Sequence, residues 1–413
     1  MPLQRQEPRP VALRLRWLTA EADTMLKQIR HYNKLLGACV VLRRRNDWRI
    51  NGQKYFRVVA ATICRRNLVW ERLLQRRKNS ATAAKFSHYD SFGGEQFRQM
   101  FRFRKREFLI ILLNLDMLDA YGNPIVLRVG RSGHRAIVTA DFCLMVCLAR
   151  LAYPLRYVDL AARLGGSRTI CCDVFHYMIE KIDVMYGFVV MDIDRWLDED
   201  NVLDCCDIMA AADDRLRHIL GFLDTTFQPC ARPGGDGCVF ESIDQRDVYS
   251  GHKKRHGLKW QVLVFANGLS CTSRESPGGF GDTVILAESG WLVRLQTVSQ
   301  LLGFDACVIA DGQYSRGPHI VRRNIRDEQV ESDEMSDLLN TWRVLVENDF
   351  ASLHNNWHYL TNPSKTVLAT ASFARIWRTS MLFHNLQAIA YGNQVTARLG
   401  YHLQHLSFSS YLT

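Results

Sequence analysis

The spacing of hydrophobic and polar positions changes along the chain near residue 218. Before this point, apolar residues recur at helical intervals, and over residues 11–78 many of the positions between them are basic. This pattern predicts two or three basic amphipathic helices, followed by a polar linker over residues 79–94. After residue 218, short apolar runs end on acidic residues or glycine turns, which is typical of strands. We therefore expect helical regions followed by an α/β domain.

A helix-turn-helix is predicted at about 138–183, within the helical part. Two helical runs flank Gly165-Gly166, which would end the first helix, and Ser167 stands at the N-cap position of the second. The second helix would offer four polar residues to a DNA groove, which are Arg168, Thr169, Asp173 and His176. Two interpretations remain open here, because trihelical units with this pattern also serve only as packing modules.

The same changes of pattern divide the chain into three regions. A basic helical region with its linker spans 1–95, and a helical region with the helix-turn-helix and an acidic connector spans 96–217. The α/β domain spans 218–413. Residues 120–137 are rich in glycine and arginine, so we expect a loop there and an all-α N-terminal part overall.

The predicted elements of the α/β domain follow the order strand, two-stranded hairpin, helix, strand and late helices. Asn267-Gly268 is a two-residue hairpin turn between apolar runs. Two strands each end on an aspartate, Asp224 and Asp311, and Glu347 falls in a later helical stretch. Carboxylates are hard oxygen ligands for Mg²⁺ and Mn²⁺, and a pair of such ions suits phosphodiester chemistry. The three acids therefore predict a divalent-metal phosphodiesterase site.

Each acid also has a purely structural interpretation. Asp224 and Asp311 could cap the turns after their strands. Glu347 could be a solvated helix residue that pairs with Arg343, four positions earlier. Asp282 opens a predicted helix, where an N-cap role explains it as well as a role as a further metal ligand does. Taken as an ordered set, the acids favour the metal site.

Basic side chains gather between the two strand-borne aspartates. They lie near the predicted hairpin and comprise His252, Lys253, Lys254, His256 and Lys259. These residues suit contacts with DNA phosphates beside a metal site. A solvated hairpin edge is the alternative that the pattern leaves open.

The net charge of +11 is unevenly distributed along the 413 residues. Residues 1–110 contain 25 Lys and Arg against 8 Asp and Glu, so the remainder carries a net charge of −6. A basic N-terminal part favours a polyanionic partner, and nucleic acid is the commonest one. Basic helices that are merely kept soluble by their charge are the alternative.

Cysteine usage and hydropathy indicate the cellular compartment in which the protein acts. The 12 cysteines show neither a disulfide framework nor zinc-ligand spacing, which favours a reducing environment. No signal peptide is apparent, and the most apolar segment is too short to cross a bilayer, so we expect no membrane association. Basic clusters such as Arg43-Arg44-Arg45 suit nuclear import, although such clusters are common. We expect a nuclear protein, with the cytoplasm as the alternative.

Five stretches occur in an order that resembles the DDE endonuclease domain of PIF/Harbinger-type transposases and of nuclease-like proteins derived from them. They are Gly221–Thr226, Tyr249–Gln261, Pro277–Asp282, Ala310–Tyr314 and Arg343–Phe350. The resemblance covers about 219–390, and the predicted helix-turn-helix also stands where that family has one. One departure is Gly281, where the family usually has a histidine.

The resemblance implies a ribonuclease-H-like fold, with a mixed five-stranded sheet flanked by helices behind the all-α region. It implies that Asp224, Asp311 and Glu347 are a catalytic triad that binds Mg²⁺ or Mn²⁺, with Asp282 as a further candidate ligand. It also implies DNA as substrate and a separate Myb-like DNA-binding partner. A homo-oligomer is a further expectation, which does not rest on the resemblance.

Two functions are compatible with these features. The first is a metal-dependent DNA endonuclease or transposase that hydrolyses phosphodiester bonds, with or without transfer of the cut strand. The second is a domesticated transposase derivative that binds DNA or protein without cleaving. The intact set of acids favours the first function.

Overall fold

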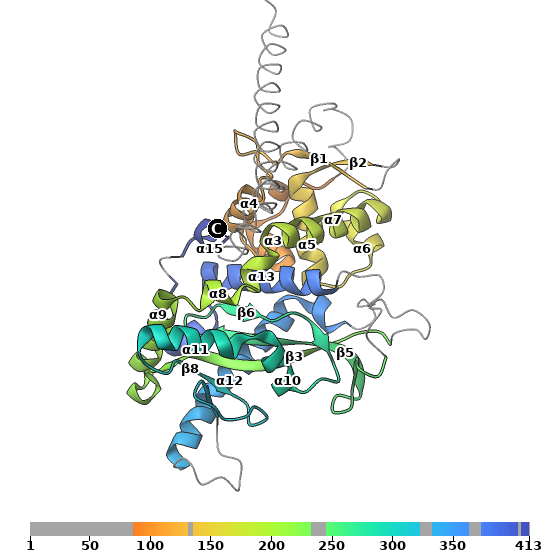
Figure 1. Cartoon of the computed structure of the whole chain (residues 1–413). Coiled ribbons are helices and arrows are strands. Elements are labelled where there is room, and N and C mark those ends of the chain that lie inside the picture. Colours follow the sequence, from red (N-terminus) through yellow and green to blue (C-terminus); the bar gives the residue numbers. More distant parts are fainter. Residues whose placement is uncertain are drawn as a thin grey trace, which may run out of the picture. The chain divides into compact units, whose positions relative to one another are not determined.

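The structure is a computed structural model. It describes residues 86–130, 135–232, 245–322, 333–362, 373–403 and 406–412 (Figure 1). The chain divides into two compact units, which are Met1–Phe86 with Leu118–Ala140, and Ser87–Met117 with Asp141–Thr413. The basic helices predicted over residues 11–78 lie outside the described residues.

In the first unit, the described residues form a two-stranded antiparallel sheet. Its strands are β1 (Val126–Val129) and β2 (Ala136–Thr139). Leu127 is buried and the following Arg128 is exposed, so apolar and polar side chains alternate as they do in a half-buried strand. The predictions of a loop over 120–137 and of an all-α N-terminal part are therefore wrong, because the glycine and arginine content hid this alternation.

The helical part of the second unit contains the predicted pair of helices around a glycine turn. Its helices are α3 (Gly94–Phe101), α4 (Lys105–Asn114), α5 (Ala140–Ala152), α6 (Tyr157–Leu164), α7 (Arg168–Tyr186), α8 (Ile193–Trp196) and α9 (Glu199–Ala212). Gly165 and Gly166 both have positive φ, which favours glycine between α6 and α7. The Ser167 hydroxyl accepts a hydrogen bond from the Ile170 N–H at 3.3 Å, so the predicted N-cap is confirmed.

A mixed sheet forms the centre of the second unit. Its strands are β3 (Ile219–Pro229), β4 (Tyr249–Ser250), β5 (Arg255–Phe265), β6 (Ser270–Thr272), β7 (Ser276–Pro277), β8 (Cys307–Ala310) and β9 (Ile320–Val321). The order is β4-β5-β3-β8-β9, and β6 and β7 also pair with β5. β3 is antiparallel to β5 and parallel to β8. This arrangement is compatible with a ribonuclease-H-like fold, although the described sheet has 7 strands instead of the expected five.

Helices flank this sheet (Figure 1). They are α10 (Asp282–Ser289), α11 (Trp291–Leu302), α12 (Asp333–Asn356) and α13 (Phe373–Tyr391). Two further helices follow: α14 (Gln394–Leu399) packs against α9 and α12, and α15 (Phe408–Leu412) packs against α4. The Trp260 ring of β5 stacks on Trp377 of α13, with 4.6 Å between the ring centroids. β5 and β6 form the predicted hairpin, and Gly268 has a φ of 86°, but the loop spans three residues, 266–268, instead of the expected two.

Helices on both sides of residue 217 belong to one compact unit. α7 packs against α13, and Arg378 donates to Asp183 through both Nε and Nη2. The guanidinium of Arg150 in α5 lies over the Tyr359 ring, at 5.4 Å from its centroid. The helical region therefore shares its packing with the sheet domain downstream. No helix in the described parts of the chain is long and apolar enough to span a membrane.

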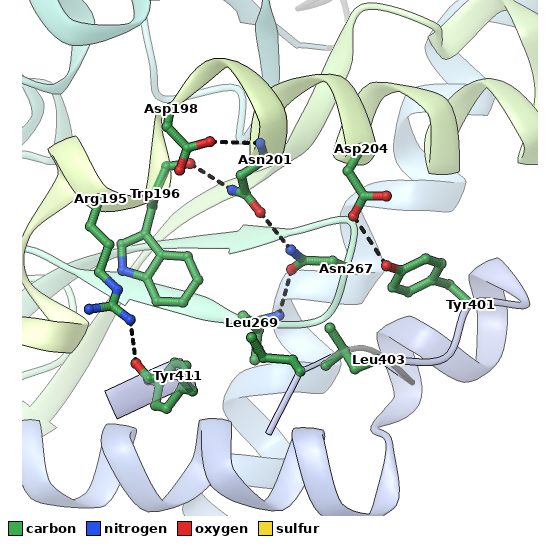
Figure 2. Close-up of a pocket in the computed structure, with 11 residues that line it drawn as sticks. Arg195, Trp196, Asp198, Asn201, Asp204, Asn267, Leu269, Tyr401, Leu403 and Tyr411 are labelled. Atoms are coloured by element: carbon green, nitrogen blue, oxygen red, sulfur yellow. Dashed lines mark hydrogen bonds between the residues drawn. The ribbon is translucent and has the colours of Figure 1, made fainter. Parts of the chain in front are cut away.

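α9 is joined by hydrogen bonds to the β5–β6 turn and to the residues that follow α14, as Figure 2 shows. The Asn267 side-chain amide donates to Asn201 at 2.9 Å, and the Tyr401 hydroxyl donates to Asp204 at 3.1 Å. Arg195 donates to a backbone carbonyl of α15. A groove of about 280 Å³ lies between these groups. Because these polar groups are already bonded to one another, the groove belongs to the joint between the segments.

A buried polar network connects α12 and α13 with β6. Asn385 accepts a hydrogen bond from the Ser270 N–H at 3.0 Å and donates to the Ser270 carbonyl and the Tyr411 hydroxyl, both at 2.8 Å. Asp349 accepts from the Ser270 hydroxyl at 3.0 Å and lies 2.7 Å from His384 Nε2. Buried polar groups need such partners, so the network fixes both helices against the sheet.

Replacing Asn385 by Ala should destabilise the protein by about 2–4 kcal/mol, because the substitution leaves buried backbone groups of Ser270 without partners. Urea unfolding followed by circular dichroism measures this change. Asn355→Ala is the matched control, since Asn355 is exposed on α12 and its loss should change stability by less than about 0.5 kcal/mol. Equal effects of the two substitutions would contradict a structural role for the network.

Candidate active site

Two of the predicted acids lie on neighbouring strands at the same level of the sheet. Leu223 of β3 pairs with Ala310 of β8 in parallel register. Asp224 and Asp311 are the next residues on each strand, and neighbouring strands lie about 4.8 Å apart. Both side chains line one cleft of about 800 Å³. The sheet therefore brings the two carboxylates together.

Asp224 is not at the end of its strand, in contrast to the sequence prediction. β3 continues to Pro229, and Asp224 pairs with Val262 of β5. The parallel pairing with β8 is what ends beside Asp224, because β8 itself ends at Ala310. Asp311 follows β8 directly, as predicted.

Glu347 and Asp282 line the same cleft from two helices. Glu347 belongs to α12, which packs against β3 and β8, and Asp282 is the first residue of α10. The cleft therefore collects all the acids that the sequence singled out. The alternative that Asp282 acts as the N-cap of α10 is wrong, because Gly281 occupies that position.

The two strand-borne acids bond to the backbone that follows them. Asp224 Oδ1 accepts from the Thr225 N–H, and Asp311 Oδ1 accepts from the Gly312 N–H, both at 2.7 Å. The pKa of Asp224 is raised to about 6, chiefly by burial and also by the nearby charges of Asp311 and Asp282. The Thr225 hydrogen bond and the Arg343 charge act in the opposite direction. Charge repulsion and burial thus both oppose ionisation of Asp224.

Two cationic side chains pair with the other acids. Arg343 Nη2 lies 2.8 Å from Glu347 Oε1, and Arg343 Nη1 lies 3.9 Å from Asp311 Oδ1. Lys259 Nζ lies 2.9 Å from Asp282 Oδ1 and donates to a backbone carbonyl at 2.8 Å. The helical ion pair that the sequence offered as the structural interpretation of Glu347 is therefore present, inside the same cleft.

Comparison with known families decides what kind of domain carries this cleft. Residues 223–403 match the family model described as DDE superfamily endonuclease. This range contains every acid of the cleft and the whole sheet except the first residues of β3. The chain carries a DDE superfamily endonuclease domain. No curated protein and no solved structure matches the chain significantly. The predicted resemblance to transposase-type DDE endonucleases is thereby confirmed.

The acids of the DDE domain fit a divalent cation in their chemistry. Carboxylate oxygens are the donors that Mg²⁺ and Mn²⁺ prefer, and DDE endonucleases normally use such ions. Within the described residues, however, no group of three His, Cys, Asp or Glu side chains is arranged to hold a metal ion. Two of the acids are instead engaged by Arg343 and Lys259.

Basic residues of the DDE domain also line the cleft. His252 and Lys253 lie in the exposed turn between β4 and β5 and line the cleft. Lys254 is exposed in the same turn but is not among the lining residues. Arg168 and Thr169 are exposed at the start of α7 and do not line the cleft either. The structure thus brings only part of the predicted DNA-binding set together with the acids.

Several cleft residues were not identified as site residues from the sequence. Arg255, Thr225, Thr226 and Gln313 line the cleft. Arg255 continues the basic run that follows His252, and this position was the available signal. Thr225 and Thr226 belong to β3, and Gln313 lies in the turn after β8, so whether they line the cleft depends on tertiary packing that local sequence does not specify.

A buried tyrosine lies beside the acids. Tyr314 is 1% exposed, and burial, together with the charges of Asp282 and Asp224, raises the pKa of its hydroxyl. The hydroxyl therefore stays protonated at neutral pH. Its position three residues after Asp311 was the available sequence signal.

Replacing Asp224 by Asn should stabilise the metal-free fold at neutral pH by about 1–3 kcal/mol. Asn can still accept the hydrogen bond from the Thr225 N–H. It also removes the carboxyl group, whose pKa rises from 3.8 to about 6 on folding. Because the folded pKa is raised, the destabilisation by Asp224 is complete above pH 6 and disappears below about pH 4.

Denaturant unfolding at several pH values, in the presence of a chelator, measures the difference between Asp224→Asn and the unsubstituted protein. The difference should shrink as the pH falls through this window. A constant difference between pH 4 and pH 7 would show that the carboxylate is not perturbed in the fold.

Proposed function

We propose that the protein is a metal-dependent endonuclease that cuts DNA in the cleft lined by Asp224, Asp311 and Glu347. The observation that supports this most is the pairing of Leu223 with Ala310, which sets two carboxylates side by side. The match to a DDE superfamily endonuclease over the same residues supports nuclease chemistry in this cleft.

The acids would hold Mg²⁺ or Mn²⁺, with Asp282 as a further candidate ligand. Such ions supply an activated water or DNA 3′-hydroxyl and stabilise the leaving oxygen, so hydrolysis and strand transfer are both open to the site. The Thr225 and Gly312 N–H groups would orient the two aspartates, since each already donates to one carboxylate oxygen. Burial keeps the Tyr314 hydroxyl protonated. It would donate a hydrogen bond to groups that lie among the acids of the cleft.

DNA would lie against the basic residues that line this cleft. His252, Lys253 and Arg255 are exposed and line it, which suits contacts with phosphates. Lys259 pairs with Asp282. It would therefore hold that acid in place and keep its own positive charge near the phosphate. Lys254, and Arg168 and Thr169 on α7, would contact DNA outside the cleft.

The cellular setting follows from the same proposal. A DNA-cutting protein with this basic composition would act in the nucleus, with a Myb-like DNA-binding protein as partner and as a homo-oligomer.

A non-cleaving derivative that binds DNA or protein is the second candidate. The Arg343–Glu347 ion pair favours that candidate, because a cationic side chain on the third acid suits a cleft that holds no metal.

Purified protein should nick supercoiled plasmid in the presence of Mn²⁺, and Asp311→Ala should lower the rate about a hundredfold or more, because it removes a proposed metal ligand. Gel quantification of nicked plasmid measures this effect. Asp305→Ala is the matched control, because Asp305 is an exposed aspartate just before the same strand. Unchanged activity of Asp311→Ala would reject the site, whereas DNA binding without nicking by the unsubstituted protein would favour the non-cleaving derivative.

Substituting Lys253 or Arg255 by Gln should weaken DNA binding and reduce the slope of log affinity against log salt by about 1 each, because each side chain would neutralise one phosphate. Fluorescence anisotropy with a labelled duplex at several salt concentrations measures the slope. Arg215→Gln is the control, since Arg215 pairs with Asp213 and does not line the cleft. A slope that stays the same in both variants would place DNA elsewhere.

A further inference from the structure

Arg343 occupies a position where it competes with a cation for the acids. Its two terminal nitrogens lie 2.8 Å from Glu347 and 3.9 Å from Asp311. The guanidinium is thus close to two of the three carboxylates that a metal would need. A guanidinium cannot lose its charge in a protein, so Arg343 stays a cationic competitor wherever the acids are ionised.

The ion pair with Glu347 can form without the rest of the site. Arg343 and Glu347 are one helical turn apart on α12, at the i,i+4 spacing at which side chains meet. Their side chains are 25% and 51% exposed, and such partly exposed pairs are weak. A second partner for either side chain can therefore separate them.

DNA offers such a partner to Arg343. The guanidinium lines the cleft together with Lys253 and Arg255, which are the proposed phosphate contacts. Arginine binds phosphate through two parallel hydrogen bonds, and a phosphate oxygen competes well with a half-exposed carboxylate. A phosphate in the cleft would draw Arg343 away and leave Glu347 free.

We propose that Arg343 makes metal binding by the acids depend on bound DNA. Without DNA, Arg343 holds Glu347, and the described acids form no ready metal site. With DNA, a phosphate takes Arg343, and Glu347 joins Asp224 and Asp311 as a ligand. Arg343 is then a positioning residue that restricts the loaded site to DNA-bound protein. This inference rests on the proposed function.

Linkage makes the proposal quantitative. If DNA strengthens metal binding by some factor, the metal strengthens DNA binding by the same factor. Coupling between two sites typically corresponds to a factor of about 5 to 150. Removal of the Arg343 charge should eliminate most of this factor, because Glu347 is then free with or without DNA.

Mn²⁺ binding to the full chain tests this, by electron paramagnetic resonance of the free ion, with and without a short duplex. Ions that the duplex binds alone are subtracted. In the unsubstituted protein, the duplex should raise Mn²⁺ affinity at least about fivefold. In Arg343→Gln, Mn²⁺ affinity without DNA should already approach the DNA-bound value, and the duplex should add less than about twofold. Arg343→Lys, which keeps the charge, should retain part of the DNA dependence.

Arg215→Gln is the control for removal of an arginine outside the cleft and should behave as the unsubstituted protein. Asp311→Ala distinguishes a failure of the proposed function from a failure of the proposed role of Arg343. If Asp311→Ala binds Mn²⁺ as well as the unsubstituted protein does, the proposed function itself fails. If Asp311→Ala loses Mn²⁺ binding but Arg343→Gln matches the unsubstituted protein with and without duplex, the role of Arg343 is overturned and the metal site stands.

Discussion

The parallel pairing of β3 with β8 is the constraint on which the candidate site depends. Backbone hydrogen bonds fix Leu223 opposite Ala310, and the following residue on each strand is an aspartate. Side chains have no freedom to avoid this proximity, because the ladder sets the strand spacing. Two carboxylates are thereby placed in one partly buried cleft, where the charge of Asp311 helps to raise the pKa of Asp224. The remaining features of the cleft, including its two internal cations and its backbone donors, act to offset that repulsion.

Helix α12 carries the third acid and is fixed from its opposite side. Glu347 is half-exposed in the cleft, whereas Asp349, two residues later, is buried and bonded to Ser270 and His384. Two residues correspond to about 200° of rotation around a helix, so these acids face opposite directions. The buried network holds the helix axis, so the proposed release of Glu347 from Arg343 would require only side-chain motion. A rigid frame with exchangeable ion pairs is therefore a consequence of where the two acids fall in the helical repeat.

Local chemistry explains why some features could be predicted from the sequence and others could not. The Ser167 N-cap and the hairpin at Asn267-Gly268 depend on residues within a few positions, and both are present, although the hairpin loop has three residues instead of two. The i,i+4 pair of Arg343 with Glu347 was also visible as one of two interpretations. The position of Asp311 on the other side of that guanidinium was not visible, since it requires the packing of α12 on the sheet. The Lys259–Asp282 pair likewise joins β5 to α10, so the sequence could not show it and offered a local N-cap role as one of two interpretations of Asp282.

The stability of the cleft bears on whether it cuts DNA. Asn at position 224 would keep the Thr225 hydrogen bond without the charge, and β3 would still pair with its neighbours through backbone groups. A cleft that only bound DNA would also gain from losing its acids, since carboxylates repel the phosphates that Lys253 and Arg255 attract. Acids and bases in one cleft are compatible with bound DNA when a cation lies between carboxylate and phosphate. The acids of this DDE domain are therefore costly for a module that only binds DNA, and this cost supports the proposed metal-dependent cleavage.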